Sequence, residues 1–294
     1  MSTRSGIIAL AGRPNAGKST LVNRIVGEKV AIVSDKPQTT RREIRGIATG
    51  EDWQLVLVDL PGVQRPRDRM TDRMQKRVEQ SLADADAVVF VLNGNQDVGA
   101  GDRYIARALR GSSTPSITVV NKIDRLDHTG IVKALTAAAN LDVPGDVFPI
   151  SARRGTGVDE VVEHLKGMLP EGPFLYPAEA LSDQAELVHL AELVREQVLL
   201  RTRQELPHAV EAQVLEMTER EDGMLMIDAC LYVEGNSQKG ILVGRQGSMI
   251  KSIGTAARKE IEAATGAAVH LDLKVRVRSG WRGDDSLLDR LGIE

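Results

Sequence analysis

The sequence predicts an α/β protein: a first domain built on a mostly parallel sheet, followed by a smaller α+β domain. Over the first 170 of its 294 residues, short apolar runs alternate with helical patterns, which is typical of a parallel sheet covered by helices. Prolines and glycines then cluster between Pro170 and Pro177, and the pattern that follows has the order α-β-β-α-α-β. We therefore predict domains at 1–170 and 182–294, joined by a linker at 171–181.

In the first domain the expected strands are Gly6–Ala11, Ile44–Ala48, Gln54–Asp59, Ala87–Leu92, Ser116–Val120 and Val147–Ile150. Helices are expected between most of them, at Ser19–Val26, Asp72–Leu82, Asp102–Leu109, Thr129–Ala139 and Val158–Met168. The second domain is expected to begin with an amphipathic helix over 183–204, because apolar residues recur there at three- and four-residue steps. Alternating strands follow at Ala209–Met217 and Met224–Val233, then a helical stretch over 238–265 and a last strand at Ala268–Val277.

Composition excludes several classes of protein. The single cysteine, Cys230, rules out an intrachain disulfide and indicates a reducing compartment. The five histidines lie far apart, so no His/Cys group has the spacing of a metal site. The apolar run Ile7–Ala11 is too short for a signal peptide, and no later run approaches the length of a membrane span. We expect a cytoplasmic protein, at most peripheral to a membrane.

The strongest motif is Gly12-Arg-Pro-Asn-Ala-Gly-Lys18-Ser19, which has the phosphate-loop pattern and lies between an expected strand and an expected helix. Its glycines allow backbone amides to converge on phosphates, and the positive end of the helix adds to them. Lys18 is expected to reach the β- and γ-phosphates, and the Ser19 hydroxyl to bind Mg²⁺. A glycine turn before a helix is the alternative. The predicted nucleotide contacts here are Gly12, Asn15, Ala16, Gly17, Lys18, Ser19 and Thr20.

Three further motifs follow expected strands, at the edge where open α/β sheets bind ligands. Asp59-Leu-Pro-Gly62 can hold Mg²⁺ through water and touch the γ-phosphate, although Asp-x-Pro-Gly is also a common turn. In Asn121-Lys-Ile-Asp124 the Asp124 carboxylate can accept hydrogen bonds from N1 and N2 of guanine, which adenine cannot donate. Ser151-Ala-Arg153 can offer a backbone amide to the guanine oxygen. The domain is therefore predicted to be a P-loop GTPase that converts GTP to GDP and phosphate, with further contacts from Asp59, Asn121, Lys122, Asp124, Ser151, Ala152 and Arg153.

This combination of motifs resembles the translation-factor-like GTPases. Asn15 in the phosphate loop, together with Pro37-Gln-Thr-Thr-Arg41, resembles the Era family in particular. The resemblance implies that Thr40 is the Mg²⁺-binding threonine of the first switch. Ser19, Thr40 and, through water, Asp59 would then hold the ion. From the residues alone, a solvated loop is the alternative for Thr39 and Thr40.

The residue after Gly62 bears on hydrolysis. Many small GTPases carry a water-orienting Gln there. Here the position is Val63, which cannot hydrogen-bond water, and Gln64 comes one residue later. Unassisted hydrolysis is therefore expected to be slow, with Lys18, Thr40, Gly62 and Asn15 as the catalytic set. Asn15 resembles the asparagine that helps hold K⁺ beside the phosphates in related GTPases, and this ion would supply charge in the transition state.

The second switch, which follows Asp59, departs from the Era family at Leu60, where Thr is usual. Asp59 and Gly62 remain, so we expect nucleotide binding to survive, whereas the departure puts the positioning of this switch in doubt. The switch runs into a basic stretch in which Asp68 and Asp72 are interleaved: Arg65, Arg67, Arg69, Arg73, Lys76 and Arg77. We interpret this stretch as a solvated helix start; a docking surface that changes with the nucleotide is the alternative.

The second strong segment is 238–254, which contains Gly244-Arg-Gln-Gly247. Apolar residues flank this Gly-x-x-Gly at helical spacing, so we predict a loop that joins two helices. It resembles the loop of KH domains, which presses its backbone against four nucleotides of single-stranded RNA. The order α-β-β-α-α-β resembles the type II-like KH domain that the Era family carries at its C-terminus; a structural helix hairpin is the alternative. The predicted RNA contacts are Gly240, Ile241, Gly244, Arg245, Gln246, Gly247, Lys251, Lys274 and Arg276.

The other conspicuous residues of the second domain are expected to be structural. KH domains bind RNA in a groove more than on aromatic platforms, so Tyr232 and Trp281 are predicted to pack rather than stack. His270 alternates with the apolar face of the last strand and is expected at the surface. Cys230 is most simply a small core residue.

The net charge of −3 argues against a nucleic-acid binder when the chain is taken whole. Its distribution argues the other way. Residues 1–172 carry a net +3, residues 173–235 a net −9, and residues 236–282 a net +6. The basic charge is thus concentrated on the segment assigned to RNA, where it would steer phosphates.

The resemblance covers nearly the whole chain and implies a GTP-operated switch that binds the 3′ end region of 16S ribosomal RNA and assists biogenesis of the small (30S) subunit. GTP-bound protein would hold RNA, and hydrolysis would release it. Family members also occur loosely at the inner face of the cell membrane, so the resemblance extends to peripheral membrane contact. We expect a monomer that does not bind DNA. The alternative is an RNA chaperone in which nucleotide is structural and turnover is incidental, and Val63 makes this alternative conceivable. A GTPase of tRNA modification or membrane traffic would leave the KH segment idle.

Overall fold

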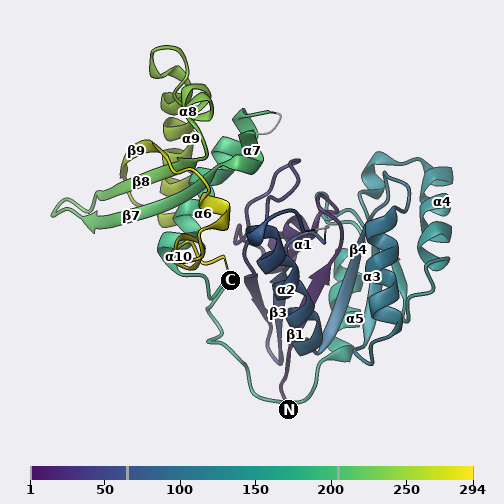
Figure 1. The fold of residues 1–294 in the computed structure, drawn as a ribbon. Helices are drawn as coiled ribbons and strands as arrows, with labels where there is room; N and C mark the ends of the chain where they lie inside the picture. Colours follow the sequence, from purple (N-terminus) through teal and green to yellow (C-terminus); the bar gives the residue numbers. More distant parts are fainter. Residues whose placement is uncertain (1, 64–65, 204–205, 294) are drawn as a thin grey trace. The chain divides into compact units, whose positions relative to one another are not determined.

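The computed structural model describes residues 2–63, 66–203 and 206–293. It contains two compact units. The first takes in the chain up to Asp183, except for Ser34–Thr39 and Asp68–Met70, which belong with the second unit from Gln184 onward. Each unit has a sheet of its own, with six strands in the first and three in the second (Figure 1).

The sheet of the first unit has the order β2-β3-β1-β4-β5-β6, in which only β2 is antiparallel to its neighbour. Its strands are β1 Arg4–Ala11, β2 Ile44–Thr49, β3 Trp53–Asp59, β4 Ala87–Asn93, β5 Ser116–Asn121 and β6 Val147–Pro149. The helices are α1 Lys18–Val26, α2 Arg69–Asp84, α3 Ala100–Arg110, α4 His128–Ala139 and α5 Val158–Met168, and a 3-10 turn, η1, covers Ile123–Arg125. Every strand and helix predicted for this domain is present, with ends shifted by up to three residues.

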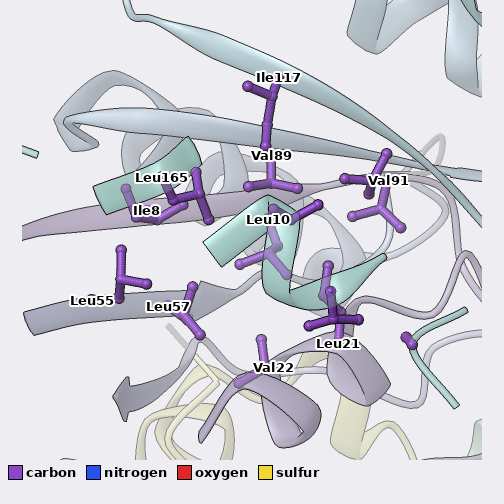
Figure 2. Close-up of a cluster of buried hydrophobic side chains, with 14 of the residues drawn as sticks. Ile8, Leu10, Leu21, Val22, Leu55, Leu57, Val89, Val91, Ile117 and Leu165 are labelled. Carbon is purple, nitrogen blue, oxygen red and sulfur yellow. The ribbon is translucent and has the colours of Figure 1, made fainter. Parts of the chain in front are cut away.

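The alternation of side chains along the buried strands divides the core into two layers. Ile8 and Leu10 of β1 point to the face that α1 and α5 cover, where they meet Leu21 and Leu165 (Figure 2). Ala9 of β1 and its neighbours point to the opposite face, covered by α2, α3 and α4. A sheet buried on both faces explains why its strands read as continuous apolar runs in the sequence.

Beyond α5 the chain is held along the first unit; we call the segment 171–183 the strap. Near its start the Gly172 amide donates to the Thr3 carbonyl at 3.0 Å. Near its end the Ile47 amide of β2 donates to the Leu181 carbonyl at 2.9 Å. The segment predicted as a linker is therefore bound to the first sheet along its length.

The second unit has the predicted order α-β-β-α-α-β with two short additions, α7 Leu206–Ala209 and α10 Asp285–Arg290. Its sheet, β7-β8-β9, pairs β7 with β8 antiparallel and β8 with β9 parallel. The remaining elements are α6 Glu186–Arg201, β7 Glu211–Glu219, β8 Leu225–Val233, α8 Asn236–Val243, α9 Ser248–Thr265, β9 Val269–Val277 and the 3-10 turns η2 Arg245–Gly247 and η3 Trp281–Gly283. Ala209, expected to begin a strand, ends α7 instead.

The prediction that 183–204 forms an amphipathic helix is wrong in two respects. Helix α6 ends at Arg201, and residue 204 lies outside the described residues. Ten consecutive residues, Leu190 to Leu199, are buried, so no polar face is left. The buried charges are compensated: the Arg195 guanidinium pairs with Glu192 at 2.6 Å and with Glu211 of β7 at 3.7 Å. Along the described residues, none of the helices combines the length and the apolar character needed to cross a bilayer.

Candidate functional site: a phosphate loop and a Gly-x-x-Gly loop

The phosphate loop joins β1 to α1 in a conformation that depends on glycine. Gly17, the residue before α1, has φ of 102°, and a Cβ there would lie 2.2 Å from Asn121 Nδ2. A Cβ on Gly12 would lie 2.5 Å from the Val91 carbonyl, and one on Gly62 would lie 2.6 Å from the Pro14 nitrogen. Asn15 also has a positive φ, 62°. A side chain at Gly12, Gly17 or Gly62 would clash with a neighbouring segment, so this conformation requires glycine at all three positions.

Three oxygen-bearing side chains meet beside the loop. Ser19 Oγ donates to Asp59 Oδ2 at 2.6 Å, and Thr40 Oγ1 donates to the same oxygen at 3.1 Å. The two hydroxyl oxygens are 3.1 Å apart. Asp59 is fully buried, so desolvation raises the pKa of its carboxyl, while Lys18 and the hydroxyls of Ser19 and Thr40 oppose the rise. The three residues predicted to hold Mg²⁺ are thus brought together.

This corner fits Mg²⁺. All its groups are hard oxygen ligands, the kind that Mg²⁺ prefers. Asp59 Oδ1 is buried and finds no hydrogen-bond partner among the described residues, which is costly unless a cation or water binds there.

Lys18 is 5% exposed and donates to the carbonyls of Gly12 and Arg13 at 3.3 and 3.4 Å. Burial lowers the pKa of Lys18, and the nearby Asp59 carboxylate opposes that shift.

Asn121 connects the phosphate loop to the two segments predicted to bind guanine. Its Nδ2 donates to the Ala16 carbonyl at 2.9 Å. Its Oδ1 accepts from the amides of Lys122 at 2.7 Å and Ala152 at 3.0 Å. The Lys122 ammonium donates to the Asn15 carbonyl at 2.5 Å. Three predicted site segments are therefore bonded to one another: the phosphate loop, Asn121–Asp124 and Ser151–Arg153.

Asp124, in η1, is the residue predicted to bind the guanine base, and its side chain is held by Ser151. Ser151 Oγ donates to Asp124 Oδ1 at 2.7 Å, and this bond is the main cause that lowers the pKa of Asp124. The carboxylate therefore stays ionised and fixed, as recognition of two N–H donors requires. Ser151 is 1% exposed, and the loop around Arg153 is held from behind by Arg24, which donates to the Ala152 and Arg153 carbonyls at 3.2 and 2.6 Å.

Arg24 was not among the sequence candidates. It lies on α1, one turn and a half beyond Ser19, and it resembles any solvent-facing arginine of a helix. Its role arises from the tertiary contact between α1 and the loop after β6, for which the sequence has no local signal. Thr20, a predicted contact, lies in the first turn of α1 and is partly buried.

Leu60 and Val63, which follow Asp59, lie in the same core layer. Leu60 is fully buried in the core layer under α2 and α3, which gives a packing reason for an apolar residue where the family usually has Thr. Val63 belongs to the same layer and is 7% exposed, with its amide donating to the Gly12 carbonyl at 3.2 Å. Gln64 and Arg65 lie outside the described residues.

Part of the basic stretch behind the second switch lies in a helix and forms ion pairs. From Arg69 onward the stretch belongs to α2, where Lys76 pairs with Asp72 at 2.9 Å one turn away. Arg77 pairs with Glu43 at 2.8 Å. The Lys76–Asp72 pair agrees with a solvated helix, whereas Arg77 pairs outside α2 with Glu43, whose side chain is 9% exposed.

In the second unit, Gly244–Gly247 forms the predicted turn between two helices. Gly244 has φ of 72° and Gly247 has φ of 76°, and Gln246 between them is also left-handed, at 52°. A Cβ on Gly244 would lie 2.7 Å from Met249 Cβ, whereas a Cβ on Gly247 would meet nothing within 4 Å. Gly244 therefore allows the turn to pack closely against Met249, whereas the backbone at Gly247 is open to a ligand.

The side chains around this turn are accessible. Arg245, Gln246 and Lys251 are exposed, and Ile241 on α8 is 55% exposed, which is unusual for a large apolar side chain. Behind them Leu242, Ile253, Ala257 and Ile261 are fully buried and anchor α8 and α9 on the domain. Gly240 is exposed one turn before Gly244. An exposed apolar residue beside two cations and an open backbone is a surface suited to single-stranded RNA.

Lys274 and Arg276 lie elsewhere. They alternate with the apolar residues of β9, and α9 covers the apolar side, since a Cβ on Gly254 would lie 4.0 Å from Leu273 Cδ2. Both cations therefore face away from α9 and from the loop that precedes it. Lys274 is also engaged, at 2.8 Å with Asp272 and 3.3 Å with Asp228.

The structural roles predicted for four other residues of this unit are confirmed. Tyr232 is 8% exposed and donates to Gln213 at 3.1 Å. Trp281 is fully buried, and its indole donates to the Ala209 carbonyl at 3.2 Å. Cys230 is fully buried and His270 is exposed.

Among the described residues, no group of three or more His, Cys, Asp or Glu side chains could hold a metal ion.

Two family models match the chain. The model described as a 50S ribosome-binding GTPase matches residues 7–122, and the KH domain model matches residues 205–282. Among curated relatives, GTPase Era of Lactobacillus helveticus is 43% identical over 99% of this chain and 96% of its own length. GTPase Era of Halothermothrix orenii is 42% identical over the full length of both chains.

Two solved structures resemble the chain along 99% of both partners, each with a TM-score of 0.94 and 31% identity. One is Era in complex with MgGDPNP and nucleotides 1506–1542 of 16S ribosomal RNA. The other is a variant of Aquifex aeolicus Era bound to GDP and an aluminium fluoride. Both sites described above thus lie in parts of the chain that align with these proteins.

Proposed function

The chain belongs to the Era family of GTPases, and from that premise we propose that it is a GTP-operated switch for assembly of the small (30S) ribosomal subunit. Its C-terminal KH domain would bind the 3′ end region of 16S ribosomal RNA. The observation that carries the proposal is the likeness over 99% of the chain to Era bound to MgGDPNP and to nucleotides 1506–1542 of that RNA. The exposed Gly244–Gly247 turn supplies the matching surface in this chain.

The residues of the first unit have distinct roles in this proposal. Asp124, held by Ser151, selects guanine, while Lys18 and the phosphate-loop amides bind the β- and γ-phosphates. Ser19, Thr40 and Asp59 would hold Mg²⁺, which when bound neutralises charge on the phosphates. Thr40 is the residue whose position would differ between bound GTP, which has a γ-phosphate, and bound GDP, which has none. Its hydroxyl already lies at Asp59, so the first switch is connected to the nucleotide by a short path.

Hydrolysis is proposed to be slow without assistance. Val63 has no polar atom on its side chain with which to orient a water, and it is 7% exposed. Asn15 stands in the phosphate loop with its backbone in the left-handed region, and K⁺ held beside it would supply charge in the transition state. Turnover measured in matched potassium and sodium buffers tests this: a higher rate in potassium is expected, and equal rates would contradict the role of K⁺.

Binding of RNA is tested with the double variant Arg245→Asp, Gln246→Asp. Both side chains are exposed at the tip of the turn, so charge reversal there should abolish binding of a 16S 3′-end fragment while the affinity for GTP stays at the wild-type level. Unchanged RNA affinity would contradict the assignment of this turn. Equal loss of GTP affinity would indicate a folding defect instead of a binding defect, and Lys251→Ala then serves as the milder variant.

A second candidate is an RNA chaperone of ribosome assembly in which bound nucleotide is structural. Val63 is the observation that favours it, because slow turnover makes hydrolysis incidental. The two candidates differ in steady-state GTP hydrolysis: the switch requires turnover that the RNA fragment stimulates and that Lys18→Ala abolishes. We further propose a cytoplasmic monomer that acts on the 30S subunit, with peripheral contact to the membrane and no role in DNA binding.

A further inference from the structure

A cluster of polar side chains connects the end of the first switch to the strap. Glu43 stands three residues after Thr40 and directly before β2, and its side chain is 9% exposed. Its Oε2 accepts from Ser81 Oγ at 2.5 Å and from Arg77 Nε at 2.8 Å, both on α2. Because α2 lies behind the Asp59 motif along the chain, Glu43 joins the segments downstream of both switches.

Arg45 on β2 extends this connection. Its guanidinium binds the other oxygen of Glu43, with Nε and Nη2 at 3.0 and 2.9 Å from Oε1. Its Nη1 donates to the Tyr176 hydroxyl at 3.1 Å and pairs with Asp183 Oδ2 at 3.3 Å. Tyr176 donates to the same Asp183 oxygen at 2.9 Å. One arginine therefore bonds to the end of the first switch and to the last residue of the strap.

The strap is also hydrogen-bonded to β3 beside Tyr176. Gln54 of β3 is fully buried, accepts from the amides of Leu175 and Tyr176 at 2.8 and 2.9 Å, and donates to the Tyr176 carbonyl at 2.9 Å. The strap ends at Asp183, and α6 begins at Glu186. A displacement of Asp183 thus acts directly on the short connection to the second unit.

Glu43 and its partners are constrained to move together. The Glu43 side chain is 9% exposed, so its carboxylate depends on the bonds from Arg45, Arg77 and Ser81 in place of water. Three residues span at most about 10 Å of chain, so a shift of Thr40 is transmitted to Glu43 over a short distance. A shift of Glu43 must therefore either move Arg45, Arg77 and Ser81 as well or break the bonds to them.

We propose that Glu43 and Arg45 form a relay that passes the nucleotide-dependent position of the two switches to the end of the strap, and so makes RNA affinity depend on the nucleotide. Both are positioning residues, since neither lies among the predicted phosphate, guanine or RNA contacts. The relay rests on the proposed function, in which the GTP-bound protein holds RNA. It adds the path by which that state is communicated.

The test uses the full-length protein and a 16S 3′-end fragment. The RNA dissociation constant is measured with GDP and with a non-hydrolysable GTP analogue, and their ratio gives the coupling, about 5–150-fold for typical allosteric pairs. Glu43→Gln keeps the shape but removes the charge. It is expected to lower the ratio toward one while both nucleotide affinities stay within about twofold of wild type. Because coupling is reciprocal, the effect of RNA on the affinity for the GTP analogue should fall by the same factor.

Two further variants separate a relay from a general loosening. Tyr176→Phe removes only the hydroxyl that joins Arg45 to Asp183, so a smaller fall in the ratio is expected even where Glu43→Gln folds poorly. Glu171→Gln is the matched control, because Glu171 ties the strap to Arg4 at 3.7 Å through an exposed pair outside the relay. It should leave the ratio unchanged.

A wild-type ratio that persists in Glu43→Gln and Tyr176→Phe would overturn the relay and leave the proposed function intact. An equal fall in Glu171→Gln would overturn it too, because anchoring of the strap would then suffice. A ratio of one in the wild-type protein would contradict the switch itself, and the relay with it.

Discussion

The nucleotide site and the Gly-x-x-Gly loop are both suited to phosphates, but they present different kinds of surface. In the first, Asp59 and Asn121 are buried and already bonded to neighbouring segments. In the second, Arg245 and Gln246 stand exposed at the tip of a turn that glycine conformations define. Removing one group from the buried network leaves its partners unsatisfied, whereas the exposed loop depends on backbone shape and on screened charge. The two sites should therefore respond differently to substitution.

The largest effect is expected from Gly17→Ala in the buried site. The added Cβ would lie 2.2 Å from Asn121 Nδ2 at a φ of 102°, so the phosphate loop and the Asn121 connection must both distort. We expect the affinity for GDP, measured by titration with a fluorescent analogue, to fall by at least about 100-fold, equivalent to about 3 kcal/mol.

Gly27→Ala is the matched control for that variant. Gly27 follows the same helix with φ of 87°, and its added Cβ would meet nothing within 4 Å. The strained backbone should lower the free energy of unfolding by about 1 kcal/mol and leave GDP affinity unchanged. Equal losses of affinity in the two variants would show that helix α1, and not the loop geometry, determines binding.

The next largest effect is expected at the guanine side. Asp124→Asn should lower GTP affinity by about 10- to 100-fold, because hydrogen bonds to a charged group are lost. Ser151→Ala should cost less at neutral pH but add a pH dependence. Ser151 lowers the pKa of Asp124, so in the wild type the carboxylate stays ionised to below its ordinary value of 3.8.

Without Ser151 that pKa moves back up, and GTP affinity should begin to fall at a higher pH as the solution is acidified. Titrations between about pH 4 and pH 7 would reveal the difference. Parallel pH profiles for Ser151→Ala and the wild type would show that Ser151 does not control the ionisation of Asp124.

A moderate effect, dependent on salt, is expected at the RNA loop. Arg245→Ala and Lys251→Ala should each reduce the slope of log affinity against log salt concentration by about 0.7, the contribution of one phosphate contact on a single strand. Arg220→Ala is the control, since Arg220 lies in the β7–β8 turn beside Asp222, 3.5 Å away. A slope that changes equally in all three variants would indicate diffuse attraction and no site at the loop.

The smallest effect is expected at Asp284, which caps α10. Bonds from Ser286, Arg278 and the Leu287 amide lower its pKa to about 2. A lowered pKa means that the stabilisation is present above the ordinary value of 3.8 and is lost as the pH falls toward about 2. Asp284→Asn should therefore melt slightly below the wild type at neutral pH and match it near pH 2. A constant difference at every pH would exclude this cause.

The sequence predicted the parts of both sites that depend on local conformation. Glycines at fixed spacing between a strand and a helix, or between two helices, specify the phosphate loop and the Gly244–Gly247 turn, because the left-handed residues in each are encoded where they are needed. Asp59 and Asn121 were found because carboxyl ends of parallel strands share one edge of a sheet. These features require no knowledge of packing.

What the sequence could not predict depends on contacts between distant segments. Alternation along β9 placed Lys274 and Arg276 on one face, but only the approach of Gly254 to Leu273 shows that α9 covers the other. The charges of α6 read as a solvated face, although Arg195 is buried against Glu211 of β7. Glu43 and Arg45 look like ordinary surface residues until α2 and the strap are placed beside them.

The central claim is that the buried nucleotide site and the exposed RNA loop belong to one switch. Steady-state GTP hydrolysis, measured with and without the 16S 3′-end fragment, tests it most directly. We predict that the fragment stimulates turnover in the wild-type protein, that Lys18→Ala abolishes turnover, and that the Arg245→Asp, Gln246→Asp variant keeps basal turnover but loses the stimulation. Turnover that ignores the RNA, or stimulation that survives in the loop variant, would contradict the claim.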